Sequence, residues 1–357
     1  MKRITKIPSK VEIDFTDASL TGCGGHLFLS RKAKALRLPE TLKRMIRLKQ
    51  RNRGSDDSET LLSLIYSLAS GNGCLSDLDA LRRDQTSLKL LGLSSSPGSR
   101  RLGEYLKRVS PLEVLSLEQV CRELVSQVAP DVISHLVKEN GFVPVFVDGT
   151  GIEVSGRYFE EACKGYAGED QYWLHGVFLG GLWVSGRLRP GNYRVTGDWQ
   201  EQLDRDVLPL LEGRDVPVWV RMDNAYYSGK VVTYCLSRSW DYSISVTNPN
   251  NKEPILESVR SLPVAAWESI GKGEEAVLCY YLPTDWEREH PYVVIRSHWD
   301  GLQKLLFPRY TVILVSRGDL PLAELVRRHR GKQGQENAFK GPLIDLDLHH
   351  PACQGFH

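Results

Sequence analysis

Two aspartates stand directly after apolar stretches that are typical of buried strands. FVPVFVD ends in Asp148, and VPVWVRMD ends in Asp223. Active sites of open α/β sheets gather at the carboxyl ends of strands, so neighbouring strands would bring the two carboxylates together. Close carboxylates repel each other unless a cation lies between them. Oxygen ligands with open positions suit Mg²⁺, and two ions about 4 Å apart can drive phosphodiester displacement.

A third carboxylate is expected at Glu336, within RRHRGKQGQENAFKG. Lys332, Glu336 and Lys340 are spaced four apart, so one helix would present them on one face, with His329 about one turn further back. A carboxylate flanked by cations suits a metal ligand beside a phosphate backbone. The alternative is an ordinary surface ladder of Lys and Glu. The two aspartates, taken singly, are equally compatible with turns.

Several other side chains near these motifs are candidates for the site or for the core. Asn224, next to Asp223, is a candidate to orient a metal site through a hydrogen bond. Arg189, in RLRPGNY, either meets a phosphate or is a solvated cation in a turn. His175 is expected to pack within the sheet. The aromatic residues near these motifs are expected in the core rather than as a platform for stacking bases: Trp173, Trp183, Tyr226 and Tyr227.

His349, His350 and Cys353 lie within five residues, and this spacing raises the question of a zinc site. No fourth ligand is apparent in the sequence, and structural zinc takes four. The segment is therefore predicted to be a loop.

The composition is that of a globular protein, with 357 residues, 41% hydrophobic and 25% charged. No apolar run approaches the roughly 18 residues needed to span a bilayer, and the basic start has no apolar core of a signal peptide. Seven dispersed cysteines favour reduced thiols over a disulfide scaffold. These features predict a cytoplasmic protein without a membrane span.

Charge is unevenly distributed along the chain. Residues 1–53 contain 14 Lys or Arg and four acids, a net charge of +10, whereas the remainder carries −8. A basic head on a mildly acidic body favours a polyanionic partner for the head. The alternative is a solvated basic tail.

The elements that would position the carboxylates follow from the apolar periodicity. Residues 40–140 predict short helices joined by Ser, Pro and Gly turns. From Gly141, strands are predicted over 142–148, 172–181 and 182–193, followed by a helix, a strand over 216–223, a helix and a strand over 241–248. Three strands in a meander followed by alternating helices predict a mixed sheet with helices on its faces.

Residues 249–309 interrupt this alternation. NPNNKEP is typical of a turn cluster, and EAVLCYYLP and PYVVIRSHW predict paired strands. The segment is therefore interpreted as a β-rich insertion. A strand at RYTVILVS and one helix from Leu322 to about Lys340 would then follow.

Five short motifs resemble, in their order, the DDE transposases of bacterial insertion sequences, DDE domain group 1. They are VDGTGIEVSGR, RPGNY, RMDNAYYSG, HRGKQGQENAFK and DLHHPACQGF. With the helical block from residue 60, the resemblance covers most of residues 60–357. It implies a ribonuclease-H-like core with a β-rich insertion between the second aspartate and the glutamate. It also implies that Asp148, Asp223 and Glu336 form a metal-binding triad, with Asp148 between the two ions.

The chain departs from this family in two places. Related enzymes carry a Tyr, Arg, Glu, Lys signature, and here His329, Lys332 and Leu343 stand at the Tyr, Arg and final Lys positions. Lys332 keeps the charge but loses the bidentate grip of Arg on phosphate, and Lys340 is the candidate to replace the final Lys. The family normally continues past the HHPAC segment, whereas this chain stops at His357, so a truncated copy is expected.

The resemblance predicts a DNA transposase that cleaves and joins strands at the ends of an insertion element. Residues 1–140 would bind DNA, 141–248 and 310–357 would form an incomplete core, and 249–309 the insertion. Two Mg²⁺ ions, or Mn²⁺, would act on terminal inverted repeats and target DNA, in a homodimer on DNA in the cytoplasm near the nucleoid. The cations expected to neutralise phosphates, besides His329 and Lys340, are Lys332, Arg327, Arg328 and Arg330.

Two alternatives remain at this point. A nuclease of the same fold would cut DNA without joining it, and a non-catalytic remnant would bind element ends and block an intact enzyme. Glycoside hydrolysis by a pair of carboxylates is disfavoured by the basic head and the cations around Glu336.

Overall fold

A computed structural model gives the structure of the chain. It describes residues 20–49, 55–155, 158–165, 168–193, 198–271, 273–300, 303–331, 333–346 and 348. The chain divides into two compact units, with the division between Val120 and Cys121. Each unit is described by itself.

The first unit is helical throughout its described part, as the sequence predicted. Asp56 caps one helix by accepting a hydrogen bond from the Glu59 N–H, and Asp84 caps another in the same way. Its helices are α1 (His26–Ala35), α2 (Leu38–Met45), α3 (Asp57–Ala69), η1 (Leu75–Asp77), α4 (Leu78–Arg83), α5 (Gln85–Leu91) and α6 (Ser99–Leu106). The long helix α7 (Pro111–Asn140) runs from the first unit into the second.

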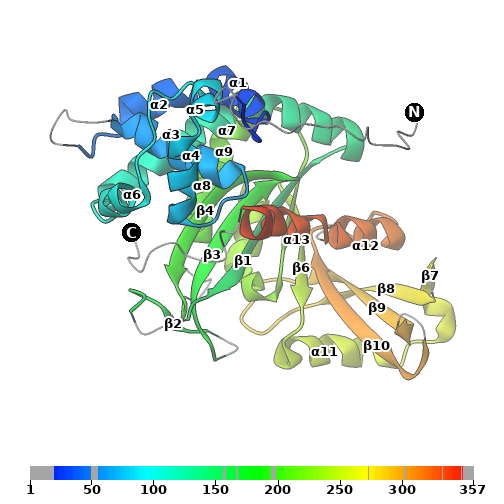
Figure 1. Cartoon of the computed structure of the whole chain (residues 1–357). Helices are drawn as coiled ribbons and strands as arrows, with labels where there is room; N and C mark the ends of the chain where they lie inside the picture. Colours follow the sequence, from blue (N-terminus) through cyan, green and yellow to red (C-terminus); the bar gives the residue numbers. More distant parts are fainter. Residues whose placement is uncertain are drawn as a thin grey trace, which may run out of the picture. The chain divides into compact units, whose positions relative to one another are not determined.

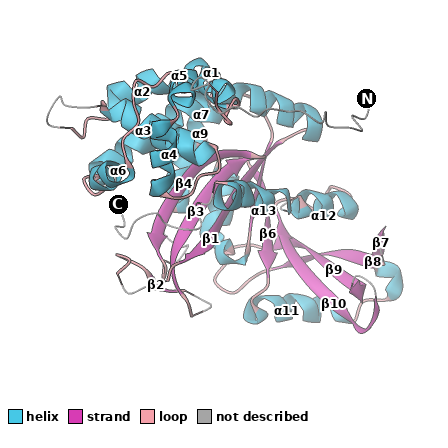
Figure 2. Cartoon of the chain, in the orientation of Figure 1, coloured by secondary structure: helices cyan, strands magenta, loops and turns pink. Residues whose placement is uncertain are grey.

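The second unit is built on one mixed sheet, which in the described part of the chain has ten strands (Figures 1 and 2). The strands follow the order β2-β3-β1-β5-β6-β10-β9-β8-β7, and β4 also pairs with β3. Their bounds are β1 (Val143–Glu153), β2 (Cys163–Lys164), β3 (Asp170–Leu179), β4 (Leu182–Pro190), β5 (Val218–Met222), β6 (Asp241–Val246), β7 (Glu268–Gly271), β8 (Glu274–Tyr281), β9 (His290–Asp300) and β10 (Gln303–Val315).

The core of this sheet has ribonuclease-H-like topology. Strands β1, β3 and β4 form the predicted antiparallel meander, whereas β5 is parallel to β1 and β6 is parallel to β5. Strand β10 then pairs antiparallel with β6 and carries β9, β8 and β7 beyond it. The predicted β-rich segment therefore extends the core sheet sideways.

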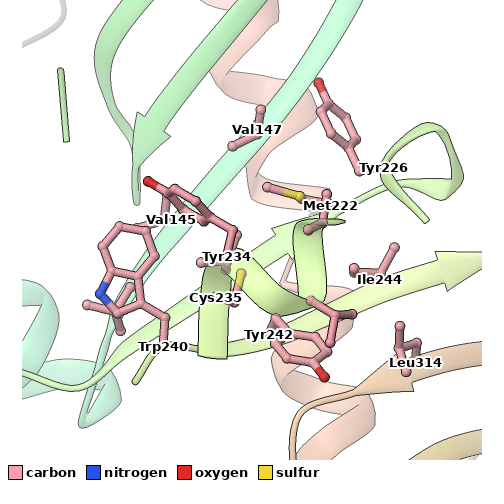
Figure 3. Packing of buried hydrophobic residues seen from close by; sticks show 14 of the residues in the cluster. Val145, Val147, Met222, Tyr226, Tyr234, Cys235, Trp240, Tyr242, Ile244 and Leu314 are labelled. Atoms are coloured by element: carbon pink, nitrogen blue, oxygen red, sulfur yellow. The ribbon is translucent and has the colours of Figure 1, made fainter. Parts of the chain in front are cut away.

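Helices cover both faces of the sheet because alternate side chains of its apolar strands point to opposite faces. The helices of the second unit are α8 (Trp199–Asp206), α9 (Leu208–Leu211), η2 (Asn224–Tyr226), α10 (Gly229–Ser237), α11 (Pro249–Arg260), η3 (Val264–Ala266), α12 (Leu322–Arg330), α13 (Gln333–Lys340) and the π-helical turn η4 (Gly341–Asp345). On one face, Val145, Val147, Met222 and Tyr226 share a core with α7, α8, α10 and α11 (Figure 3).

The opposite face packs against α12 and α13. Trp219 of β5 joins Leu325 and Val326 of α12, while Phe146 of β1 joins Phe339 of α13. Figure 1 shows these two helices following one another across the sheet. Both faces of the central strands are therefore buried, which explains their nearly continuous apolar sequences.

Three predictions about local structure are wrong. The strand expected over 142–148 continues to Glu153, so Asp148 lies within β1 and not at its end. NPNNKEP is not a turn cluster but the start of α11, because Asn248 caps the helix through its side chain and Pro249 suits the first helical turn. The single helix from Leu322 to about Lys340 is two helices, since α12 is capped by Gly331 and α13 begins at Gln333. Glycine is a poor helix former, which allows the chain to change direction there.

Membrane insertion was also tested on the structure. Within the described residues, every helix is too short or too polar to cross a bilayer.

Candidate metal-dependent active site

The register of β1 and β5 brings Asp148 and Asp223 level with each other. These parallel strands pair Val143 with Val218 and Phe146 with Arg221. The same register, continued for two residues, places Asp148 opposite Asp223 at a spacing typical of neighbouring strands, about 4.8 Å. Both side chains are half-buried. The predicted meeting of two carboxylates at this sheet edge thus has a definite geometric basis.

Both aspartates belong to the sheet face that α12 and α13 cover. Asp148 pairs with Gly176 on β3, and a Cβ built at Gly176 would lie 3.0 Å from the Phe339 ring of α13. Asp223 keeps an extended backbone, with φ −86° and ψ −175°, so the strand alternation continues to it from Arg221. Arg221 faces the same helices, as its packing below shows.

Helix α13 carries Glu336 one turn before Phe339, whose ring packs beside Asp148's strand. The side chain of Glu336 lies outside the described part of the structure, as does the whole of Lys332. Lys340 is exposed at the end of α13. The shared helical face predicted for Lys332, Glu336 and Lys340 therefore stays a prediction, because Lys332 and the Glu336 side chain lie outside the described residues.

The donor atoms at this edge are consistent with a hard divalent cation. Asp148 and Asp223 offer only oxygen ligands, they are half-exposed, and they approach from adjacent strands. Among the side chains that the structure describes, no group of three or more His, Cys, Asp or Glu is arranged to hold a metal. A third carboxylate would have to come from beyond that set, and the α13 backbone brings Glu336 to the correct face.

The turn that carries Asp223 is held by hydrogen bonds on several sides. Asp223 Oδ1 accepts the N–H of Ala225 at 2.9 Å and thereby caps η2. Asn224 Oδ1 accepts the N–H groups of Thr247 at 2.8 Å and Asn248 at 3.1 Å. Asn224, predicted to orient a metal site, therefore fastens the Asp223 turn to the loop after β6.

Tyr226, at the end of the same turn, is bonded to the sheet itself. Its hydroxyl lies 2.7 Å from Nε2 of His175, a fully buried residue of β3. The expected burial of His175 and Tyr226 is confirmed, with 0% and 2% of their surfaces exposed. The link between them was not predicted, because nothing local in either segment indicates it.

Arg221 is a second feature that sequence analysis missed. It is a charged residue inside an apolar strand and is only 7% exposed. Its guanidinium lies 4.9 Å from the centroid of the Phe146 ring, and among the described residues its Nε has no hydrogen-bond partner. Burial, and then the charges of Arg327 and Arg328, lower the pKa of Arg221 to about 10. The sequence did contain a signal for this residue, since Arg221 is a single charge within an apolar run, two residues before Asp223.

The arginines predicted to meet phosphates all have carboxylate partners within the chain. Glu324 accepts hydrogen bonds from Arg327 at 2.7 Å and from Arg328 at 2.6 Å. Arg330 makes a two-pronged contact with Glu274 at 2.6 and 2.7 Å. Any role of these arginines in DNA binding stays a prediction. To bind a DNA phosphate, each arginine would have to contact the phosphate in addition to its carboxylate partner or in place of it.

The remaining predicted residues have equally definite places. His329 is 8% exposed and lies 3.0 Å from Ser245 Oγ through Nε2, so it packs between α12 and the sheet. Arg189 is not a solvated turn cation, because it forms an ion pair with Asp198 in a partly buried setting. His349, His350 and Cys353 fall outside the described residues.

A groove of about 1350 Å³ adjoins the Asp223 turn. Tyr226, Tyr227 and the first turn of α10 line one side, and the connection between β8 and β9 lines the other. Tyr227 stacks on Trp286 with ring centroids 5.3 Å apart. Cationic side chains reach the groove from both sides, namely Lys230, Arg238 and Arg288.

Comparisons with known proteins identify a family and one structure with limited similarity. The family model described as "Transposase DDE domain group 1" matches residues 5–357. No curated protein matches the chain. A cryo-EM structure of the piggyBac transposase synaptic complex with hairpin DNA matches with a TM-score of 0.41 and 13% identity, over 90% of this chain. The present chain spans 66% of the length of that transposase chain.

The family match covers nearly the whole chain. The chain therefore belongs to the transposase DDE domain family, group 1.

Proposed function

We propose that this chain is a DNA transposase, with Asp148, Asp223 and Glu336 as the ligands of two divalent cations. The observation that carries the proposal is the β1–β5 register, which brings two carboxylates level on the face covered by α13. The family assignment supports transposition as the process.

The residues of the chain have separable roles in this proposal. Asp148 extends from the middle of β1, where its backbone pairs with Gly176 of β3. Asp223 and Glu336 approach it from a neighbouring strand end and from a helix across the sheet face. When bound, Mg²⁺ or Mn²⁺ would activate the attacking oxygen and stabilise the leaving one. The groove beside Tyr226, with its aromatic and cationic lining, would accept a DNA strand next to the site.

DNA ends with the inverted repeats that flank the gene are the proposed substrate, and a homodimer on DNA is the proposed assembly. The test uses labelled duplexes of those ends with purified full-length chain and MgCl₂. Asp148→Asn, Asp223→Asn and Glu336→Gln should each lower strand cleavage by at least about 10²-fold, because a metal ligand is lost. DNA binding should stay within about threefold of wild type, since phosphate contacts dominate affinity. Asp215→Asn is the matched control, because Asp215 is exposed just before β5.

Each outcome separates the candidate functions. Cleavage followed by joining of the labelled end to a second duplex supports a transposase. Cleavage without joining supports the nuclease, and DNA binding without any metal-dependent cleavage supports the non-catalytic remnant. Wild-type cleavage in Glu336→Gln would remove that residue from the site. Light scattering of the complex on end DNA measures whether the chain dimerises there.

A further inference from the structure

A chain of buried hydrogen bonds lies beneath the two aspartates, on the sheet face opposite α12 and α13. Gln202 of α8 donates from Nε2 to Ser185 Oγ at 2.7 Å. Its Oε1 lies 2.6 Å from His175 Nδ1, and His175 Nε2 lies 2.7 Å from the Tyr226 hydroxyl. Gln202 and His175 are completely buried, and Tyr226 is 2% exposed.

The direction of the hydrogen bonds in this chain is fixed by Gln202. Because its Nε2 donates to Ser185, its Oε1 faces His175. This oxygen must accept a hydrogen bond from the Nδ1–H of His175. Burial lowers the pKa of His175, so the ring is neutral and its Nε2 is an acceptor. The Tyr226 hydroxyl therefore donates a hydrogen bond to Nε2 of His175. Burial also raises the pKa of Tyr226, which keeps that proton in place.

This hydrogen bond connects the turn after β5, which carries Asp223, to β3, the antiparallel neighbour of the strand that carries Asp148. Tyr226 lies three residues after Asp223, in the turn that Asp223 caps through the Ala225 N–H. His175 is the cross-strand partner of Gly149, the residue after Asp148. Burial, and then the negative charges of Asp148 and Asp223, raise the pKa of the Tyr226 hydroxyl. The contact thus ties the end of β5 to β3 across the intervening strand β1.

We propose that the hydrogen bond from Tyr226 to His175 sets the separation of Asp148 and Asp223, and with it the affinity and geometry of divalent-cation binding. Tyr226 acts here as a positioning residue, since its hydroxyl is committed to His175. This inference rests on the proposed function, because it assumes that the aspartates bind metal. Nothing in the local sequence around either aspartate specifies this strut.

The proposal predicts an effect that depends on the cation. Mg²⁺ requires nearly ideal octahedral geometry with ligands at about 2.0–2.1 Å, whereas Ca²⁺ accepts variable geometry and longer bonds. A loosened pair of carboxylates should therefore lose Mg²⁺ more than Ca²⁺. Residues that orient metal ligands typically change metal affinity by about 10–100-fold when they are lost.

The test measures binding of MgCl₂ and CaCl₂ to the full-length chain by calorimetry, without DNA. Tyr226→Phe removes one hydroxyl and keeps the ring that packs in the core. We expect it to weaken Mg²⁺ binding by at least about 10-fold and Ca²⁺ binding by about threefold or less. Tyr227→Phe is the matched control. The Tyr227 hydroxyl lies 2.8 Å from the Tyr292 hydroxyl and forms its hydrogen bond there, not with a residue of β3. That variant should bind both cations as wild type does.

The results distinguish the strut from general loosening. The proposal is wrong if Tyr226→Phe binds Mg²⁺ with the affinity of wild type. It is also wrong if Tyr226→Phe loses as much affinity for Ca²⁺ as for Mg²⁺, or if Tyr227→Phe loses as much Mg²⁺ affinity as Tyr226→Phe does. Thermal unfolding of each variant checks that the site is folded, and retained Ca²⁺ binding is a second check. Mg²⁺ binding by wild type should disappear in Asp148→Asn. If wild type binds no Mg²⁺, or if Asp148→Asn binds it equally well, the proposed metal site is wrong, and this inference is wrong with it.

Discussion

The guanidinium of Arg221 packs directly against Gly331, the residue that ends α12. A Cβ built at Gly331 would lie 2.8 Å from Cζ of Arg221, closer than real Cβ contacts come. The backbone there is ordinary, with φ −56°, so an alanine at this position would have to displace the end of the buried Arg221 side chain and would not meet backbone strain. The α12–α13 junction therefore rests on a buried cation two residues before Asp223.

Gly331→Ala should consequently displace the junction and the helix that carries Glu336. We expect a loss of about 1–3 kcal/mol in the free energy of unfolding, as for overpacked core sites. Gly334→Ala is the matched control, since nothing lies within 4 Å of a Cβ there, and replacing a helical Gly adds up to about 1 kcal/mol of stability. Denaturant unfolding of both variants gives the comparison.

The same contact predicts coupling between the two positions. Arg221→Met removes the three guanidinium atoms that the new Cβ would approach. In that background Gly331→Ala should cost less, by about 1 kcal/mol or more, in a double-mutant cycle. Additive effects would show that the alanine clashes with something else, or that the junction moves freely.

Glu324 is the common counter-charge of the arginines around this junction. Hydrogen bonds from Arg327, and then from Arg328, hold its pKa down at about 2. Glu324→Gln should cost about 1 kcal/mol at neutral pH, because the pairs are partly exposed and two cations near Arg221 lose their anion. The loss should shrink at high salt, as screening weakens all these charges.

The pH dependence of that effect has a definite sign. Since the folded pKa of Glu324 is depressed, its contribution is complete above about pH 4.5 and is lost as the pH falls toward about 2. Wild type and Glu324→Gln should therefore converge in stability under acid. Glu212→Gln, at an exposed site, should follow wild type at every pH. A constant gap between wild type and Glu324→Gln across this range would contradict the assigned role.

The strands and both aspartates were predictable because the signal is local. Each central strand is buried on both faces, so it appears in the sequence as a nearly continuous apolar run, and an aspartate follows the runs of β1 and β5, although β1 itself continues past Asp148 to Glu153. Asp148 and Asp223 were found in this way. That their strands are parallel neighbours was only a condition of the sequence argument, and their matching register was not predicted, since no local pattern encodes the offset between two strands.

The parts that sequence analysis missed depend on contacts between distant segments. The spacing of Lys332, Glu336 and Lys340 fits one helix, whereas the structure caps α12 with Gly331, which packs on Arg221, and begins α13 at Gln333. The strut from Tyr226 to His175 joins residues 51 apart in sequence. Arg327 and Arg330 looked like free cations because their carboxylate partners are not evident from the motif.

His175 makes the stability of the chain depend on pH. Burial lowers its pKa below the ordinary value of 6.5, so the unfolded chain binds a proton there that the folded chain does not. This contribution is complete above about pH 6.5 and is lost as the pH falls, at up to about 1.4 kcal/mol per pH unit. Replacing His175 with Asn should lower stability at pH 7.5 yet flatten its decline between pH 6.5 and 5. Equal slopes in denaturant titrations would contradict this assignment.

Asn224 offers the most direct test of how the Asp223 turn is held. Its Oδ1 accepts two backbone N–H groups, from Thr247 and Asn248, so Asn224→Ala leaves two donors without their partner. The expected cost is about 1–3 kcal/mol, and both amides should exchange hydrogen faster than in wild type. Asn224→Asp keeps an acceptor oxygen in place, so it should retain the slow exchange. Fast exchange in both variants would show that the amide group acts through its NH₂ instead, and that the loop after β6 is not what fixes Asp223.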